Sequence, residues 1–408
     1  MKPSNPPTHF NQAGFSLVEI MVGLAIGLLA TLVVLQVFSV YEGQKRTTTG
    51  TADAQTNGNV ALYDIKRDLG MAGYGLLPIS NTPQDCGLAN LPFTIDATTG
   101  LTGVNAIAPV TITDGGTGTG ASDIITIHYG ASDSGGGFSP VAALFAGNTV
   151  SVNDNLACNL NDIALIVHST KGSCDLTKVQ GLPTTRNIQL PSIPPTTAVG
   201  DNLACLGTWK EIEYRINQNY NPAVAANSQA YLQRKQTLFP PGPPPGGQPA
   251  EPSVADIVNI QAQYGISASA TSNKIIQWVN ARDAANWKVA VDGQLVTDAS
   301  GNNIDFGPSL TVDNRRLIKA VRVAVVARNG LLEKTNVTNS YFGKACSSLT
   351  ANAPSGVCAW AGSSAGTAIT SPAPEIDLSN DTNWQHYRYR VFETIIPMRN
   401  VIWSGSVL

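Results

Sequence analysis

The sequence predicts an α+β protein in which a long N-terminal transmembrane and amphipathic helix packs on a mainly antiparallel β-sheet head with long loops. Three observations predict this class. One apolar run near the N-terminus is long enough to cross a membrane, short alternating apolar segments recur through the rest of the chain, and Gly, Asn, Asp and Thr separate them. Of the 408 residues, 43% are hydrophobic. This fraction is ample for a core and excludes a globally disordered chain.

The apolar run covers residues 15–40, and its only ionisable side chain is Glu19. At roughly 1.5 Å per residue it forms a helix of about 39 Å, which exceeds the hydrocarbon thickness of about 30 Å. A carboxylate inside such a run costs about 2.5–3.5 kcal/mol on insertion scales and normally marks function. The alternative is that Glu19 lies at the level of the lipid headgroups, where it costs little. In either case we expect a membrane helix.

The residues around the start of this run carry a family resemblance. Gly14-Phe15-Ser16-Leu17-Val18-Glu19 resembles the processing site of type IV prepilins and pseudopilins. The resemblance implies that a prepilin peptidase cleaves between Gly14 and Phe15, that Phe15 becomes N-methylated, and that Glu19 takes part in assembly. An ordinary secretory signal differs, because its small residues follow the apolar region.

The resemblance also implies a domain organisation and a location. Residues 1–14 are expected to be the leader, 15–40 the transmembrane part of the helix, 41–75 its periplasmic part, and 76–408 a periplasmic β-rich head. The protein would be single-pass in the inner membrane and would enter a pilus at the cell surface. Basic residues just after the apolar run favour the opposite orientation by the positive-inside rule. The processing site and the six downstream cysteines outweigh them.

Further elements follow from local patterns. We expect the helix to break within residues 47–58, where Thr and Gly are frequent, and to resume with Leu62, Ile65 and Leu69 on one face before glycines end it. Alternating or continuous apolar segments predict strands at 124–129, 163–168, 211–216, 317–327 and 387–394. Helical spacing predicts a second helix at 254–264, with Ser253 as its N-cap.

Segments of the downstream chain look like features of the PilW family of type IV pilus minor pilins. They are IKRDLGMAGYG, VADIVNIQAQYG, IKAVRVAVVARN and YRYRVFETIIPMRN. The resemblance implies a role in initiating pilus assembly, with the pilus tip as a candidate location, in support of twitching motility and adhesion. Its implied partners are the prepilin peptidase, other minor pilins, the major pilin and the inner-membrane assembly platform. A type II secretion pseudopilin is the alternative, because that class shares the processing site.

An even number of cysteines in an exported domain predicts disulfides, with buried free thiols as the alternative. The candidates are Cys86, Cys158, Cys174, Cys205, Cys346 and Cys358. Spacing favours Cys158–Cys174 and Cys346–Cys358, which leaves Cys86–Cys205, although six cysteines allow about 15 pairings.

Patterns for catalysis and ligand binding are weak. The cysteines form no C-x-x-C pair and the four histidines are scattered, so we predict no metal site and no cofactor. The sequence around Ser364 fits G-x-S-x-G, but loops flank it instead of the strand and helix that a nucleophile elbow needs. A net charge of −3 without a basic cluster predicts no specific nucleic acid binding. We predict a protein that is not an enzyme; a membrane-anchored periplasmic enzyme is the second alternative.

Overall fold

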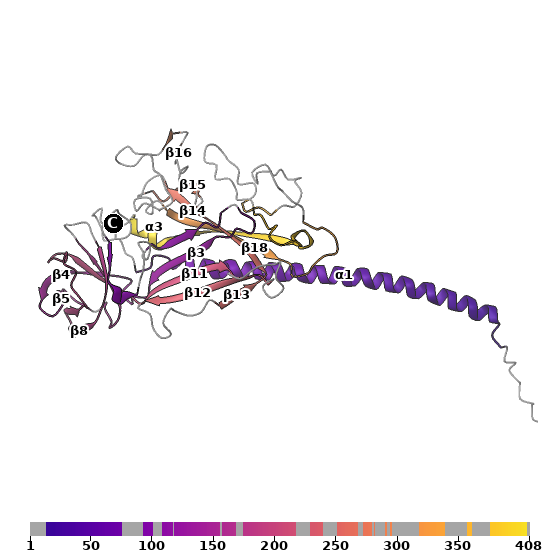
Figure 1. Ribbon diagram of the computed structural model, residues 1–408, viewed down its shortest axis with the longest axis horizontal. Helices are drawn as coiled ribbons and strands as arrows, with labels where there is room; N and C mark the ends of the chain where they lie inside the picture. Colours follow the sequence, from indigo (N-terminus) through magenta and orange to yellow (C-terminus); the bar gives the residue numbers. More distant parts are fainter. Residues whose placement is uncertain are drawn as a thin grey trace, which may run out of the picture. The chain divides into compact units, whose positions relative to one another are not determined.

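The protein contains one long helix and several β-sheets (Figure 1). The computed structural model describes residues 14–75, 93–100, 108–116, 118–155, 157–168, 174–217, 229–239, 251–267, 272–279, 281, 290–291, 294–295, 318–338, 357–360 and 376–405. The chain divides into two compact units, Met1–Ala52 and Asp53–Leu408. The second unit holds the described sheets and is called the head below.

Helix α1 runs without interruption over Leu17–Leu69. The break expected within residues 47–58 is therefore wrong. The Thr48 and Thr51 hydroxyls donate to the carbonyl oxygens of Gln44 and Thr47, at 2.9 and 2.8 Å, so the helix itself satisfies these side chains. Each glycine disfavours a helix by only about 1 kcal/mol, which the packing of the helix end offsets. The glycines after Leu69 end the helix as predicted, and Gly73 has a φ of +73°.

The sheets are antiparallel in every described pair except β1 with β7, which confirms the predicted fold class. The eight-stranded sheet has the order β1(Phe93–Ile95)-β7(Cys174–Lys178)-β6(Ile163–Val167)-β10(Asn202–Gly207)-β4(Phe138–Phe145)-β5(Thr149–Val152)-β9(Asn187–Gln189)-β8(Gly181–Thr184). The five-stranded sheet has the order β13(Glu251–Ala255)-β12(Tyr231–Phe239)-β11(Trp209–Ile216)-β3(Ile124–Gly130)-β2(Val110–Thr113). The four-stranded sheet has the order β15(Ile275–Val279)-β14(Ile257–Ser267)-β18(Ile318–Arg328)-β19(Tyr389–Pro397), and β16(Ala290–Val291) pairs with β17(Gln294–Leu295). Short helices are η1(Ala97–Thr99), η4(Trp384–His386) and α3(Arg399–Gly405).

One hydrophobic core joins the end of α1 to the five- and four-stranded sheets. Ile65 and Leu69 are buried in it, with Leu62 packed at its margin, as the helical spacing predicted. Strands β2, β3, β11, β14 and β18 contribute most of the remaining apolar side chains. The end of α1 is therefore a core element of the head.

Four predicted strands coincide with β3, β6, β11 and β18, which confirms them. The fifth, predicted at 387–394, begins two residues later as β19 and continues to Pro397. In β11, the inward residues Ile212, Tyr214 and Ile216 are buried as the alternation predicted.

The helix expected at 254–264 is wrong, because this segment forms the end of strand β13 and most of strand β14. All eleven residues of β14 are buried between β15 and β18. Residues 259–267 alternate between polar and apolar, with Ile260, Ala262, Tyr264 and Ile266 in the core. The helix was expected because Ile257, Ile260 and Tyr264 also fit helical spacing, and a short segment of this kind is compatible with either element. Ser253, the expected N-cap, lies in β13, where its hydroxyl donates to Asp64 Oδ2 at 3.0 Å.

The disulfide pairing also differs from the expectation. Cys158 is bonded to Cys205, with a Cα–Cα distance of 5.2 Å, so both Cys158–Cys174 and Cys86–Cys205 are wrong. The reason is strand register: β10 pairs with β6, which places Cys205 opposite Ala164 and close to the segment that precedes β6. Cys174 and Cys358 are disulfide-bonded as well. Residues 1–13 of the leader, Cys86, Cys346 and the motif around Ser364 lie outside the described residues.

Candidate functional site

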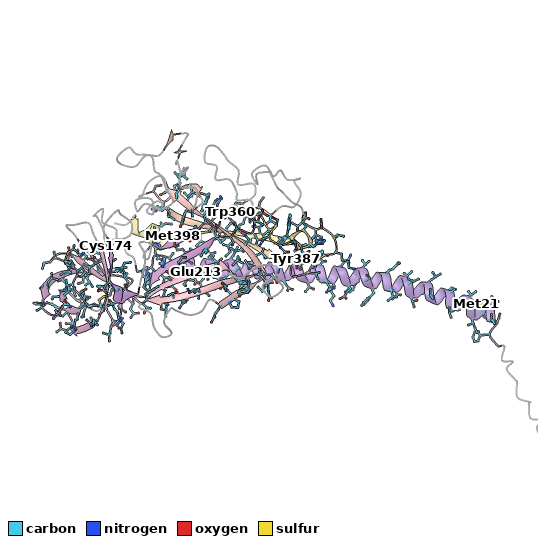
Figure 2. All side chains as sticks on the ribbon, viewed as in Figure 1. Met21, Cys174, Glu213, Trp360, Tyr387 and Met398 are labelled. Atoms are coloured by element: carbon cyan, nitrogen blue, oxygen red, sulfur yellow. A yellow bond between two sulfur atoms is a disulfide. The ribbon has the colours of Figure 1, made fainter. Side chains whose placement is uncertain are left out.

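The N-terminal part of α1 presents apolar side chains on all sides. It contains a window long and apolar enough to cross a membrane, and none of that window is buried within the structure. Met21, which is labelled near the start of the helix in Figure 2, is 64% exposed. A helix that is apolar all round requires an apolar surrounding, which is either lipid or the apolar surfaces of other proteins.

Residues 14–19, called the processing motif because they resemble a prepilin processing site, lie at the start of this surface. Ser16 begins the helix: its carbonyl oxygen accepts the N–H of Ile20 at 3.2 Å, and its hydroxyl accepts the N–H of Val18 at 3.3 Å. Glu19 lies in the first turn of α1, where the positive end of the helix dipole favours a carboxylate. A Cβ added at Gly14 would meet no atom within 4 Å, so packing within the fold does not require glycine there.

The other end of α1 is held in the head by a cluster, the docking cluster, formed by the buried Asp68 and Tyr214 and the partly buried Arg234. Tyr214 on β11 donates its hydroxyl to Asp68 Oδ2 at 2.6 Å. Arg234 on β12 donates Nε to the same oxygen at 2.7 Å. Asp68 is only 5% exposed. Because a carboxylate in the last turn of a helix opposes the helix dipole, it needs these two donors from the sheet.

The electrostatics of the docking cluster match this geometry. Burial raises the pKa of the Tyr214 phenol, and the neighbouring Asp68 raises it further. Burial alone would lower the pKa of Arg234, but the hydrogen bond and charge of Asp68 raise it above its ordinary value. The phenol therefore stays protonated and the guanidinium stays charged, so both remain donors to Asp68.

A second contact places α1 against the four-stranded sheet. The ring of Phe392 on β19 lies where a Cβ on Gly58 would be, so only glycine at this position admits the ring. Glycine is unfavourable in a helix interior, yet here its missing side chain creates the space that Phe392 fills. Gly58 is therefore a packing position and not a helix break.

The opposite face of the four-stranded sheet buries a cation between aromatic rings. The Arg322 guanidinium carbon lies 4.1 Å from the centroid of Trp360 and 5.0 Å from that of Trp278. Its Nε donates to Gln263 Oε1 at 2.7 Å, and burial lowers the pKa of Arg322 to about 10. Trp360 is labelled in Figure 2. Because the Arg322 guanidinium is enclosed by these side chains, it stabilises the packing of the head.

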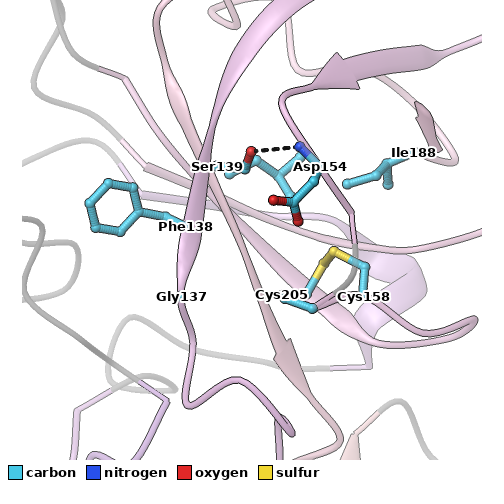
Figure 3. Close-up of a pocket in the computed structure, with 9 residues that line it drawn as sticks. Gly137, Phe138, Ser139, Asp154, Cys158, Ile188 and Cys205 are labelled. Atoms are coloured by element: carbon cyan, nitrogen blue, oxygen red, sulfur yellow. Dashed lines mark hydrogen bonds between the residues drawn. A yellow bond between two sulfur atoms is a disulfide. The ribbon is translucent and has the colours of Figure 1, made fainter. Parts of the chain in front are cut away.

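A small cavity lies beside the disulfide in the eight-stranded sheet (Figure 3). Its volume is about 190 Å³, and Phe138, Asp154, Cys158 and Cys205 are among its lining residues. Pockets that enclose small-molecule ligands measure about 300–1,000 Å³, so this one is below the usual range. Within the described ranges, no group of three or more His, Cys, Asp and Glu could hold a metal ion.

Gly14, Phe15 and Glu19 lie near one another because they are close in sequence, and not because folding brings them together. Sequence reasoning missed the docking cluster, whose members Asp68 and Tyr214 are 146 residues apart. One signal was available: the alternation in β11 turns Tyr214 inward, and a buried tyrosine hydroxyl requires a partner. Nothing local identifies Asp68 as that partner.

Comparisons with known proteins agree with this arrangement. Residues 220–400 match the family model described as type IV pilus-assembly protein W, and residues 9–35 match the prokaryotic N-terminal methylation motif. These families are pilus components and not enzyme families. No curated protein and no solved structure gives a match. The first range contains β12–β19, and the second contains the processing motif with the start of α1. The two matches support a type IV pilus-related pilin that resembles the PilW family and has a prepilin-type N-terminal motif.

Proposed function

We propose that this chain is a minor pilin that initiates type IV pilus assembly. The observation that carries the proposal is an unburied apolar helix that directly follows a prepilin processing motif and has Glu19 in its first turn. Prepilin peptidase cleaves between Gly14 and Phe15 and Phe15 is methylated. The helix then leaves the bilayer and packs against the helices of other minor pilins and the major pilin at the inner-membrane assembly platform. The head is periplasmic until the subunit enters the pilus, at its tip, where it supports twitching motility and adhesion.

The mechanism is packing and includes no catalytic step. Apolar side chains of α1 exchange contact with lipid for contact with neighbouring helices, so they stay out of water throughout. The docking cluster and the Gly58–Phe392 contact hold the other end of the helix in the head. A pull on the helix is therefore transmitted to the sheets.

Glu19 sets the height at which a subunit docks. Cleavage creates an amine at Phe15, four residues from Glu19, and an equivalent amine on each neighbouring subunit. In a low-dielectric helix bundle a carboxylate is costly without a partner, and an ion pair with such an amine relieves that cost. Only a subunit at the correct height brings the two charges together.

The experiment compares Glu19→Ala with Glu42→Ala, a carboxylate on the same helix that is also exposed. Both variants should be cleaved and remain in the membrane, but only Glu19→Ala should reduce surface pili, motility and cross-linking to other minor pilins. Equal piliation in the two strains would contradict the assembly role and leave Glu19 as a headgroup-level residue.

Processing is tested separately. Gly14→Val should leave a full-length protein in the inner membrane, because the peptidase requires a small residue before the cleaved bond. Mass spectrometry of the wild type should find methylated Phe15 at the amino terminus, and an intact Met1 would refute the prepilin assignment. A deletion strain that loses secreted enzymes while keeping its pili would favour the type II secretion alternative.

A further inference from the structure

The eight-stranded sheet lies outside both matched ranges and contains a buried histidine between two carboxylates. His168 follows β6 directly and has no exposed surface. Its Nδ1 lies 2.7 Å from Asp201 Oδ2, and its Nε2 lies 2.6 Å from Asp175 Oδ2. Ionised carboxylates only accept hydrogen bonds, so both contacts are hydrogen bonds only when both ring nitrogens carry a proton. The geometry therefore fits an imidazolium.

These contacts attach the segment between β9 and β10, residues 190–201, called the proline segment below. It contains Pro191, Pro194 and Pro195, which have no backbone N–H to donate. Side chains therefore supply part of its attachment: Asp201 contacts His168, and the Thr196 hydroxyl donates to Asp175 Oδ2 at 3.0 Å and lies 3.1 Å from His168 Nε2.

The proline segment also covers part of the edge of β4. The N–H of Gly200 donates to the carbonyl oxygen of Val141 at 2.9 Å, and the N–H of Val141 donates to the carbonyl oxygen of Asp201 at 2.7 Å. Beyond Val141, residues 142–145 of β4 have no strand on this side among the described residues. Release of the proline segment would therefore extend an edge that is already open.

We propose that His168, Asp175 and Asp201 form a pH-sensitive clasp, in which the charge on His168 holds the proline segment closed. Neutral imidazole has one N–H, so on deprotonation one of the two carboxylates faces a ring lone pair and its hydrogen bond is lost. The segment then opens on the alkaline side. Among the residues that the structure describes, the charged groups that act on His168 are Asp175, from β7, and Asp201, which precedes β10.

The direction of the effect follows from linkage. Burial alone would lower the pKa of His168, but its hydrogen bonds to Asp175 and Asp201 raise it above the ordinary value of 6.5. The pKa of His168 is therefore higher in the closed state than in the open state. At pH values below the open-state pKa, the protonated histidine stabilises the closed state fully. This stabilisation is lost as pH rises through the raised value. The clasp is thus closed in acid and opens as the pH rises through this raised pKa.

Hydrogen exchange of the full-length protein in detergent micelles tests the clasp. After correction for intrinsic exchange, protection of residues 190–201 and of Val141 should fall by up to about tenfold per pH unit in the window above about pH 6.5. His168→Gln, neutral at every pH, should expose the segment in acid and abolish the pH dependence. His128→Gln is the matched control, because His128 pairs instead with Glu211 and the carbonyl oxygen of Ala108.

Asp201→Asn keeps the proposal falsifiable should His168→Gln fail to fold. Losing one of the two carboxylates should move the midpoint of the exchange transition to lower pH. Ring signals of ¹³C-labelled histidine, assigned with the single variants, should show His168 titrating above 6.5. Wild-type protection that is independent of pH, a His168 titration at or below 6.5, or equal effects of His128→Gln would each overturn the clasp.

Discussion

The Gly58–Phe392 contact leads to a prediction that opposes helix propensity. In an exposed helix, Gly→Ala stabilises by about 1 kcal/mol. At Gly58 the new Cβ would overlap the ring of Phe392, which is partly buried in the core that joins α1 to the sheets. Overpacking of this kind costs about 1–3 kcal/mol, and expelling the ring would forfeit part of the roughly 1.5–3 kcal/mol that burying a Phe side chain contributes. We therefore expect Gly58→Ala to lower the free energy of unfolding of the head by about 0.5–2 kcal/mol.

The assay is urea unfolding of the full-length protein in micelles, followed by tryptophan fluorescence. Gly43→Ala is the matched control, because a Cβ at Gly43 meets nothing within 4 Å and lies outside the head. It should leave the head's unfolding unchanged. In a Phe392→Ala background the overlap is absent, so Gly58→Ala should become neutral or stabilising. The reasoning is refuted if Gly58→Ala stabilises the wild type, or if it destabilises both backgrounds equally.

Two further predictions concern the head. Asp68→Asn should lower its free energy of unfolding by about 1–3 kcal/mol in the same assay, because Arg234 and the neighbouring Arg67 lose their carboxylate while Tyr214 keeps an acceptor. An unchanged urea midpoint would show that the docking cluster does not fix α1. Replacing both Cys158 and Cys205 with Ser removes a bond across a sequence separation of 47 residues, for which chain entropy predicts a loss of roughly 4 kcal/mol. A double variant with the wild-type urea midpoint would contradict this expectation.

Local sequence patterns determined the features that depend on neighbouring residues alone. The membrane-length helix follows from one uninterrupted apolar run, and the N-terminal methylation motif is matched within residues 9–35 alone. The strands at 124–129 and 211–216 follow from alternation and turn residues. Each of these features can be recognised before any distant part of the chain is placed.

The tertiary structure decided the features in which distant segments compete or pair. Residues 257–267 form a strand because β15 and β18 pair with them on either side, although Ile257, Ile260 and Tyr264 also fit helical spacing. Cys158 bonds to Cys205 because β6 and β10 pair in one register. Asp68 finds Tyr214 and Arg234 only after β11 and β12 fold against α1. Such contacts depend on the closure of long loops, and local propensity carries no information about which distant groups will meet.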